Sequence, residues 1–226
     1  MKLLRCVYEP MDENAYILID EDTRECVVLD PGGDADELIQ AIEKNNLTLK
    51  AILLTHAHGD HIGALPALKE KYGVPLGIHR DEADTLASPE LNMTGSFGSA
   101  PISMSADILF QEGDVYRFGK NCALKVLHVP GHTPGGACYY SAATGQLFSG
   151  DSLFYGSIGR TDFPQLSRKR KAQTGEKEQG AEANMVLLIQ GVRDKLLTLP
   201  EDTKVYPGHG MPTRIGNEKM YNPYLR

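Results

Sequence analysis

Short apolar segments recur along the whole of this 226-residue chain, and glycine, proline and polar residues separate them. Segments this short suit β-strands, because helices usually need about ten residues or more. A fold built on so many short strands must pair them into sheets. The sequence therefore predicts strands at residues 15–19, 25–29, 51–54, 75–78, 123–129, 137–140, 147–149 and 203–206.

Between some of these segments lie apolar stripes with helical spacing. Leu38, Ile39 and Ile42 form one stripe, residues 62–72 carry a second, and the longest runs over residues 185–199 at intervals of three and four. Strands and helices mixed in this order indicate an α/β layered fold. The length suits one sizeable core, so we predict a single domain over the full chain, residues 1–226.

Residues 167–183 (SRKRKAQTGEKEQGAEA) break the pattern. They contain eight charged residues and no large hydrophobic side chain, so they cannot bury themselves. We predict a flexible charged loop there. Its basic run at 168–171 could bind nucleic acid, but three glutamates follow it. A net charge of −7 also argues against a nucleic-acid partner, and we predict none.

The remaining composition narrows the setting of the protein. No apolar run approaches the roughly 18 to 20 residues that span a bilayer, so we predict no membrane partner. The N-terminal segment MKLLRCVYEP lacks the apolar core of a secretory signal. The four cysteines form no C-x-x-C pair and are expected to be free thiols in a reducing compartment. These features predict a cytoplasmic protein and leave its oligomeric state open.

One turn, LLTHAHGDHIGA, concentrates metal-binding side chains. His56, His58, Asp60 and His61 follow directly after a predicted apolar strand. Ligands gather beyond the ends of strands in open α/β sheets, and Gly59 allows the backbone to turn sharply. Imidazole and carboxylate groups are preferred donors for zinc and similar divalent ions. The turn therefore predicts part of a metal site.

Three isolated donors follow later strands in the same manner. His132, Asp151 and His209 each come directly after a glycine near the end of a predicted strand. With the turn, they provide five histidines and two aspartates, which is too many donors for one tetrahedral ion but suits two ions sharing a carboxylate. We predict two divalent metal ions per chain, with zinc the first choice and iron or manganese also compatible.

The string THAHGDH at 55–61, followed by GHT at 131–133, GD at 150–151 and GHG at 208–210, resembles the metallo-β-lactamase superfamily. The resemblance spans essentially the whole chain. It implies a four-layer αββα sandwich with the metals at one edge, between the two sheets. It also implies a division of ligands that spacing alone leaves open: His56, His58 and His132 for the first ion, Asp60, His61 and His209 for the second, and Asp151 as the bridge.

Within the superfamily, GHTPGGACYY, GDSLFYGSIGRTDFP and VYPGHG look most like the glyoxalase II-like (hydroxyacylglutathione hydrolase-like) branch, whose members hydrolyse thioesters such as S-acyl glutathione. The resemblance implies a metal-bridging hydroxide as nucleophile, with Asp60 orienting it or taking its proton. Arg160 matches a basic position that binds a carboxylate of glutathione in relatives, and its alternative role is an ion pair with Asp162.

Two departures leave glutathione recognition open. Asp162 stands where glutathione-using relatives carry a tyrosine, two positions after the basic residue. The chain also ends soon after His209, so we expect no room for the helical C-terminal domain of glyoxalase II. Thioester hydrolysis depends on the metals rather than on either feature, so the predicted reaction class is unaffected.

Other reactions of the superfamily also stay open. GRTDF at 159–163 is shared with the persulfide dioxygenase branch, in which one iron occupies positions that match His56, His132 and Asp151. Hydrolysis of a lactone, another ester or a β-lactam is a further alternative. In every case the predicted partner is a small-molecule substrate.

Two of the seven histidines are not used by the predicted centre. His79 and His128 lie at or near the ends of predicted strands but match no ligand position of the family. We predict a structural role for both.

Overall fold

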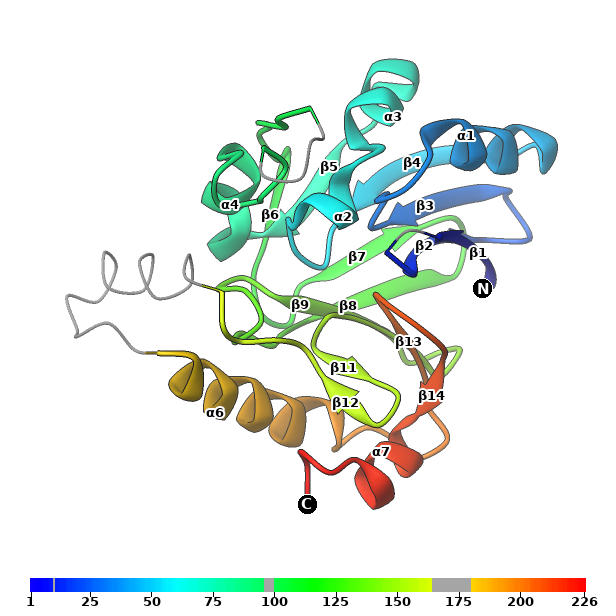
Figure 1. The fold of residues 1–226 in the computed structure, drawn as a ribbon. Coiled ribbons are helices and arrows are strands. Elements are labelled where there is room, and N and C mark those ends of the chain that lie inside the picture. The colour runs from blue at the N-terminus through cyan, green and yellow to red at the C-terminus, as the bar shows by residue number, and fades with distance from the viewer. Residues whose placement is uncertain (10, 96–99, 164–179) are drawn as a thin grey trace.

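The computed structural model describes residues 1–9, 11–95, 100–163 and 180–226. Within those residues the chain forms two six-stranded β-sheets and one two-stranded hairpin. Figure 1 shows the sheets face to face, with helices covering the outer face of each. The predicted four-layer αββα sandwich is confirmed.

The N-terminal sheet follows the chain in order. It comprises β1 (Lys2–Tyr8), β2 (Glu13–Ile19), β3 (Glu25–Leu29), β4 (Thr48–Leu53), β5 (Leu76–His79) and β6 (Ile108–Phe110). The first three strands pair antiparallel, and β3 to β6 pair parallel. Parallel neighbours need crossover connections, and helices lie within them: α1 (Ala35–Lys44), α2 (Gly59–Ile62), α3 (Leu65–Tyr72), the 3₁₀ turn η1 (Arg80–Glu82) and α4 (Ala83–Ala87).

The C-terminal sheet lies opposite. Its spatial order is β7 (Val115–Phe118), β8 (Cys122–His128), β9 (Ala137–Ser141), β10 (Gln146–Gly150), β13 (Lys204–Pro207) and β14 (Thr213–Arg214). Only β10 and β13 pair in parallel within this sheet. The connection between them contains the hairpin β11 (Leu153–Phe154) and β12 (Ser157–Ile158), helix α6 (Ala181–Gly191) and the π-helical turn η2 (Val192–Leu196), and α7 (Ile215–Tyr221) follows β14.

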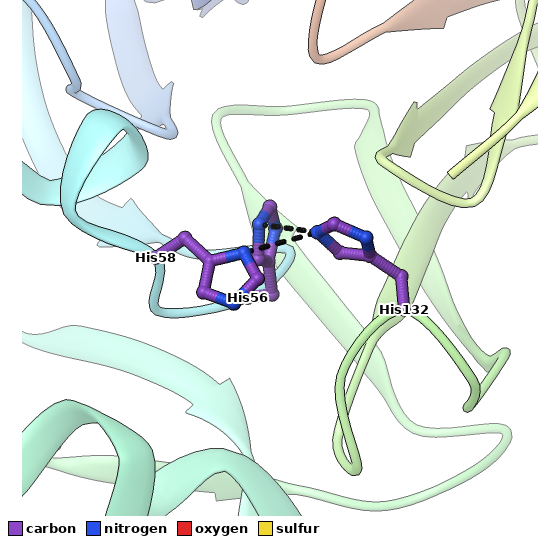
Figure 2. A group of neighbouring side chains, drawn as sticks. All are labelled: His56, His58 and His132. Carbon is purple, nitrogen blue, oxygen red and sulfur yellow. Dashed lines mark hydrogen bonds between the residues drawn. The ribbon is translucent and has the colours of Figure 1, made fainter. Parts of the chain in front are cut away.

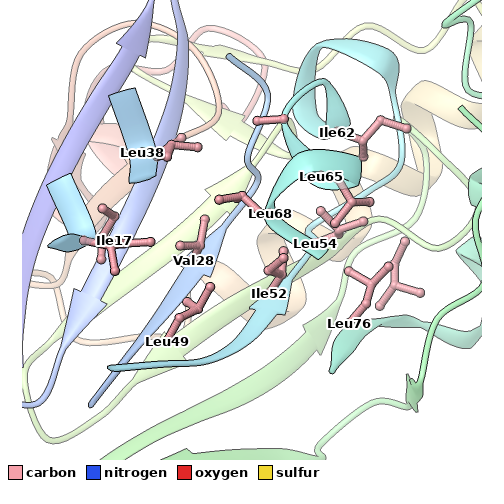
Figure 3. Packing of buried hydrophobic residues seen from close by; sticks show 14 of the residues in the cluster. Ile17, Val28, Leu38, Leu49, Ile52, Leu54, Ile62, Leu65, Leu68 and Leu76 are labelled. Carbon is pink, nitrogen blue, oxygen red and sulfur yellow. The ribbon is translucent and has the colours of Figure 1, made fainter. Parts of the chain in front are cut away.

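Alternating side chains of one strand serve two different cores. In β2, Ile17 packs with Leu38 and Leu68 beneath α1 and α3, as Figure 3 shows, whereas Tyr16 and Leu18 belong to the core between the two sheets. Successive side chains of a strand point to opposite faces, so residues 15–19 of β2, which are buried on both faces, are apolar throughout. Each fully buried aliphatic side chain contributes about 1.5–3 kcal/mol, and these cores hold the strand ends in fixed positions.

The long stripe predicted at 185–199 is helical over most of its length, and its buried face is the predicted one except at Met185. Met185 is 39% exposed, whereas Leu188, Val192 and Leu196 are fully buried against the C-terminal sheet. The helix continues as π-helical turns from Val192. Met185 lies in the first half of α6, where Ala181 and Glu182 are also exposed.

Residues 167–179 of the predicted charged loop lie outside the described residues. The last three residues of the predicted range are helical, because α6 begins at Ala181 and alanine has the highest helix propensity. None of the described helices combines the length and apolarity needed to cross a bilayer.

Candidate metal centre

Loops from both sheets meet at one edge of the sandwich. The N-terminal sheet contributes the segment after β4, where His56 and His58 precede α2 and where Asp60 and His61 lie within it. The C-terminal sheet contributes three loops, which follow β8, β10 and β13. They carry His132, Asp151 and His209 respectively. All seven predicted donors thus come together.

His56, His58 and His132 form a first donor group. His132 Nε2 lies 3.2 Å from His56 Nε2 and 3.0 Å from His58 Nδ1, the contacts dashed in Figure 2. The three rings are mutually near-perpendicular, at 83° to 86°. Ligand atoms on a tetrahedral zinc with bonds of about 2.0–2.1 Å are separated by roughly 3.3 Å. These nitrogens are therefore spaced as three ligands of one ion.

Asp60, His61 and His209 form a second donor group. His209 Nε2 lies 3.2 Å from His61 Nε2 and 3.3 Å from Asp60 Oδ2. These separations again match the edges of a small coordination polyhedron, with two imidazole nitrogens and one carboxylate oxygen. The second group is therefore spaced to hold another ion.

Asp151 stands between the two groups. Its Oδ1 lies 3.4 Å from His61 Nε2, and its Oδ2 lies 3.4 Å from His132 Nε2 and 3.6 Å from His209 Nε2. One carboxylate thus faces donors of both groups. This is the position that a ligand shared by two adjacent ions requires.

Hydrogen bonds on the far side of the rings fix their orientation. His132 Nδ1 lies 2.9 Å from the carbonyl oxygen of Arg160, and His209 Nδ1 lies 2.9 Å from that of Met11. A carbonyl can only accept, so each Nδ1 donates and each Nε2 keeps its lone pair toward the cluster. His61 Nδ1 likewise lies 3.3 Å from a carboxylate oxygen of Asp30.

Burial and mutual proximity set the charges of the donors. Burial lowers the pKa of His56 well below its usual value and that of His58 to about 3, and neighbouring histidines lower both further. Burial alone would raise the pKa of Asp60 and of Asp151. The charge of His61 outweighs it in both, with hydrogen bonds and other histidines adding to the effect, and leaves the pKa of Asp60 at about 2 and that of Asp151 well below its usual value. Neutral His56 and His58 and the ionised carboxylates are in the states that bind a divalent cation. Burial lowers the pKa of His61, but Asp151 and Asp60 outweigh it and hold that pKa well above its usual value, so a bound cation would displace a proton from His61.

Glycines beside the donors have a packing reason. A Cβ atom on Gly208 would collide with Asp151 Oδ1 and lie 2.7 Å from His61 Cε1. Gly150 has a φ of 49°, a conformation that favours glycine, and a side chain there would collide with Thr55. The repeated sequence of strand, glycine and donor therefore reflects close backbone approach at the cluster.

Arg160 lies beside the first donor group. Its side chain is 71% exposed, and its Nε and NH2 atoms donate to the two oxygens of Asp162 at 3.0 and 3.1 Å. Its guanidinium also lies 5.0 Å from the centre of the Phe163 ring, which in turn packs 4.7 Å from the ring of His58. The structure thus places Arg160 near the cluster and in the ion pair that the sequence offered as its alternative role.

His79 and His128 form a different arrangement, a histidine stack. Their rings are 3.9 Å apart and nearly parallel, at 13°. His128 Nε2 donates to the carbonyl oxygen of Pro134 at 3.0 Å. Although Asp81 lies close enough to count as a third donor, face-to-face rings do not direct two lone pairs at one point. The geometry fits the structural role predicted for this pair.

Sequence reasoning missed two buried glutamates and one aromatic residue that packs against the ligand histidines. Glu13 is fully buried and lies 4.0 Å from His61 Nδ1, and Glu82 is fully buried beside two ligand loops. Glu82 stands among other charged residues in the sequence HRDEAD, which gave no sign of burial. Phe163 lay within a recognised motif, but an aromatic residue carries no donor and was not singled out.

Comparison with known proteins finds one family model and several similar proteins. The family model described as the metallo-beta-lactamase superfamily matches residues 8–213. The probable metallo-hydrolase YqgX of Bacillus subtilis is 38% identical over 226 residues, which cover 100% of this chain and 98% of the relative. Hydroxyacylglutathione hydrolase GloC of Haemophilus influenzae is 39% identical over 211 residues, which cover 92% of this chain and 91% of the relative.

Solved structures agree with these matches. The B3 metallo-beta-lactamase BLEG-1 superposes with a TM-score of 0.84 at 38% identity, covering 99% of both chains. TTHA1623, solved in a di-iron-bound form, gives a TM-score of 0.79 at 32% identity over 98% of this chain and 100% of the other. ETHE1 from Myxococcus xanthus gives 0.74 at 28% identity over 99% of this chain and 84% of the other.

Proposed function

The chain belongs to the metallo-beta-lactamase superfamily, and we propose that it is a binuclear metallo-hydrolase of thioesters, with S-acyl glutathione the expected class and zinc the expected metal. The observation that carries this proposal is the carboxylate of Asp151, which faces both donor groups. The 39% identical relative named hydroxyacylglutathione hydrolase supports the substrate class. We assign the first donor group to one ion, the second to another and Asp151 to the bridge.

When bound, two divalent ions would lower the pKa of a shared water toward ~7 and draw electrons from the thioester carbonyl. The protein residues orient the reactants. Asp60 has the one carboxylate of the second donor group, and its low pKa keeps it ionised at neutral pH. An ionised carboxylate accepts a hydrogen bond from the attacking water and can take its proton. We therefore propose that Asp60 orients the water or removes its proton.

We propose that Arg160 binds a carboxylate of the substrate. Its guanidinium is exposed beside the first donor group and already holds one carboxylate, that of Asp162, with both arms. A substrate carboxylate would compete for the same fork. Arg160→Gln should raise KM for S-lactoylglutathione about 10-fold with little change in kcat, and Asp162→Asn should not raise it. An unchanged KM in Arg160→Gln would leave Arg160 with the ion pair alone.

The proposal is tested by metal analysis and turnover on the same sample. Protein purified without added metal should contain two ions per chain and hydrolyse S-lactoylglutathione, followed as loss of the thioester. Removal of the metals with a chelator should abolish turnover, and two equivalents of zinc should restore it. Two ions with hydrolysis of nitrocefin and none of the thioester would instead indicate the activity named for the BLEG-1 neighbour.

A mononuclear iron persulfide dioxygenase is the second candidate. The motif GRTDF favours it, and His56, His132 and Asp151 include the two-histidine, one-carboxylate set that suits oxygen activation by iron. One iron per chain, oxygen uptake with glutathione persulfide and no thioester hydrolysis would favour this reaction over the hydrolase.

A further inference from the structure

Glu82 joins the two loops that carry the first donor group. It is fully buried at the end of η1. Its Oε2 accepts a hydrogen bond from Gly135 N–H at 2.8 Å, and its Oε1 accepts one from Ala57 N–H at 3.4 Å. Ala57 separates the two histidines of the β4–α2 segment, and Gly135 lies three residues after His132. A single carboxylate therefore bonds to the backbone of both loops.

The segment that carries Glu82 packs closely against the second of these loops. A Cβ atom on Gly135 would lie 2.7 Å from the carbonyl carbon of Asp81 and collide with the backbone nitrogen of Glu82. One residue earlier in the same loop, the carbonyl of Pro134 accepts the hydrogen bond from His128. His128 stacks on His79, the residue that directly precedes η1. The histidine stack and η1, whose first residue follows His79 in the chain, thus both contact the loop of His132.

The loop that carries His209 of the second donor group is held by different contacts. Asn14 Nδ2 donates to the carbonyl oxygens of Pro207 and Gly210 at 3.0 and 2.9 Å, on both sides of His209. Tyr16 OH donates to the same Pro207 oxygen at 2.6 Å. These bonds run from β2 and do not involve η1. The loop of His209 therefore has a support of its own, whereas Asp60 and His61 share the β4–α2 segment with the first group.

We propose that Glu82 is a positioning residue that fixes the separation of the two first-group loops and thereby sets the affinity for the first ion more strongly than the affinity for the second, whose His209 loop it does not contact. The inference rests on the proposed binuclear centre. Both amides are buried, and a buried N–H that loses its acceptor carries the full cost of desolvation. A carboxylate can accept from both, because each of its oxygens is an acceptor, and its charge strengthens both bonds.

Glu82→Gln is the sharpest variant, because it keeps the shape of the side chain. The amide offers one acceptor oxygen, and its NH2 group must face the other backbone N–H. Loss of such outer contacts typically weakens metal binding 10- to 100-fold. We expect Glu82→Gln to weaken the first ion about 10-fold and to leave the affinity for the second within about 2-fold, measured by competition with a chromophoric chelator.

Glu218→Gln is the matched control. Glu218 is also buried and accepts hydrogen bonds from Gly156 N–H and from the Thr213 hydroxyl, but it lies on α7, away from the first-group loops. It should lower stability and leave the ratio of the two metal affinities unchanged. If Glu82→Gln weakens both ions equally, as a general loss of stability would, the positioning role is overturned.

Amide hydrogen exchange in metal-free protein separates this inference from the proposed function. In Glu82→Gln, the amides of Ala57 and Gly135 should exchange at least 10-fold faster than in wild type, while the amides of β2 keep their rates. This readout is independent of any ion or reaction. The wild-type protein provides a test even if the variant does not fold. In wild type, the amides of Ala57 and Gly135 should exchange with similar rates, as members of one cooperative unit. Unrelated wild-type rates, or unchanged rates in the variant, would overturn the inference even if the enzyme hydrolyses thioesters.

Discussion

The first donor group and the histidine stack are both clusters of closely spaced histidine rings, but the rings are oriented differently in the two clusters. The rings of His56, His58 and His132 lie 4.7 to 4.8 Å apart at near right angles, whereas those of His79 and His128 lie 3.9 Å apart and nearly parallel. Perpendicular rings bring three nitrogen lone pairs to one point. Parallel rings bring two flat faces together and send their lone pairs side by side.

Proximity of histidines is therefore a poor guide to a metal site, and ring orientation is a better one. Orientation in turn comes from the partner of the second ring nitrogen, as the carbonyl of Arg160 shows for His132. His128 also has a carbonyl partner, that of Pro134, yet its neighbour His79 receives the backbone N–H of Asp81 at Nδ1. A site needs every ring turned inward, and the stack lacks that feature.

Replacing one histidine of each cluster by alanine should give the largest difference in kcat/KM. His132→Ala removes a ligand of the first group and, because Lewis-acid stabilisation is worth several kcal/mol, should lower kcat/KM by about 10³-fold or more. His128→Ala should keep kcat/KM within about 10-fold, since it removes only a stacked ring and the hydrogen bond to Pro134. Metal content and initial rates measure both. Equal losses in the two variants would erase the distinction between the clusters.

Metal removal should destabilise the fold through the donor groups and not through the stack. An ion present at a thousand times its dissociation constant stabilises the folded state by about 4 kcal/mol. A chelator should therefore lower the free energy of unfolding of wild type by about this amount for each ion that it removes, and that of His79→Gln by the same total. Urea unfolding with and without chelator provides the test. A smaller chelator effect in His79→Gln would mean that the stack also binds metal.

Crowding the second donor group should cost activity without unfolding the protein. A methyl group on Gly208 would push on Asp151 and His61, and a displacement near 1 Å can cost about 10²-fold in rate. We expect Gly208→Ala to lower kcat/KM 10- to 100-fold. Gly95→Ala is the control, because a Cβ atom there has no neighbour within 4 Å, and its rate should stay at the wild-type value. Wild-type kinetics in Gly208→Ala would show that the backbone there can yield.

The pH dependence of stability should reveal the buried His79 of the histidine stack, and this is the smallest of the effects predicted here. Burial, followed by the charge of His128, lowers the pKa of His79 from 6.5 to about 4. Below pH 6.5 the unfolded chain binds this proton and the folded protein does not, so His79 makes stability fall as the pH drops from about 6.5 to about 4. In chelator, His79→Gln should lose stability less steeply over this range than wild type. The first-group histidines titrate in both proteins, so their contribution cancels. Identical slopes would contradict a buried neutral His79.

The sequence predicted the interior of the fold better than its borders. Both sheets are edged by strands that we did not predict, namely β1 and β6 in one and β7 and β14 in the other. Edge strands are exposed on one side and need charges or short lengths to avoid further pairing, so they lack the apolar runs of β2, β4 or β10. The continuous stripe at 62–72 also splits, because α2 ends at Ile62 and α3 begins at Leu65.

The parts of the candidate site that follow from residue type, such as the metal donors, could be predicted from the sequence. The parts that depend on packing could not. The seven donors converge because each follows a strand end that the core holds in place. Glu82 could not be identified, because its role comes from two backbone amides that lie far from it in sequence, Ala57 and Gly135. The pairing of Arg160 with Asp162 was predictable as an option but not as the outcome, since an exposed guanidinium can pair with a neighbouring carboxylate or remain in solvent.

Anomalous X-ray diffraction from crystals of protein purified without added metal tests the central claim most directly. The account predicts two metal peaks about 3.5–4 Å apart, one among His56, His58 and His132 and one among Asp60, His61 and His209, with Asp151 touching both and no peak at His79 and His128. A single peak, or a peak at the stacked pair, would contradict it.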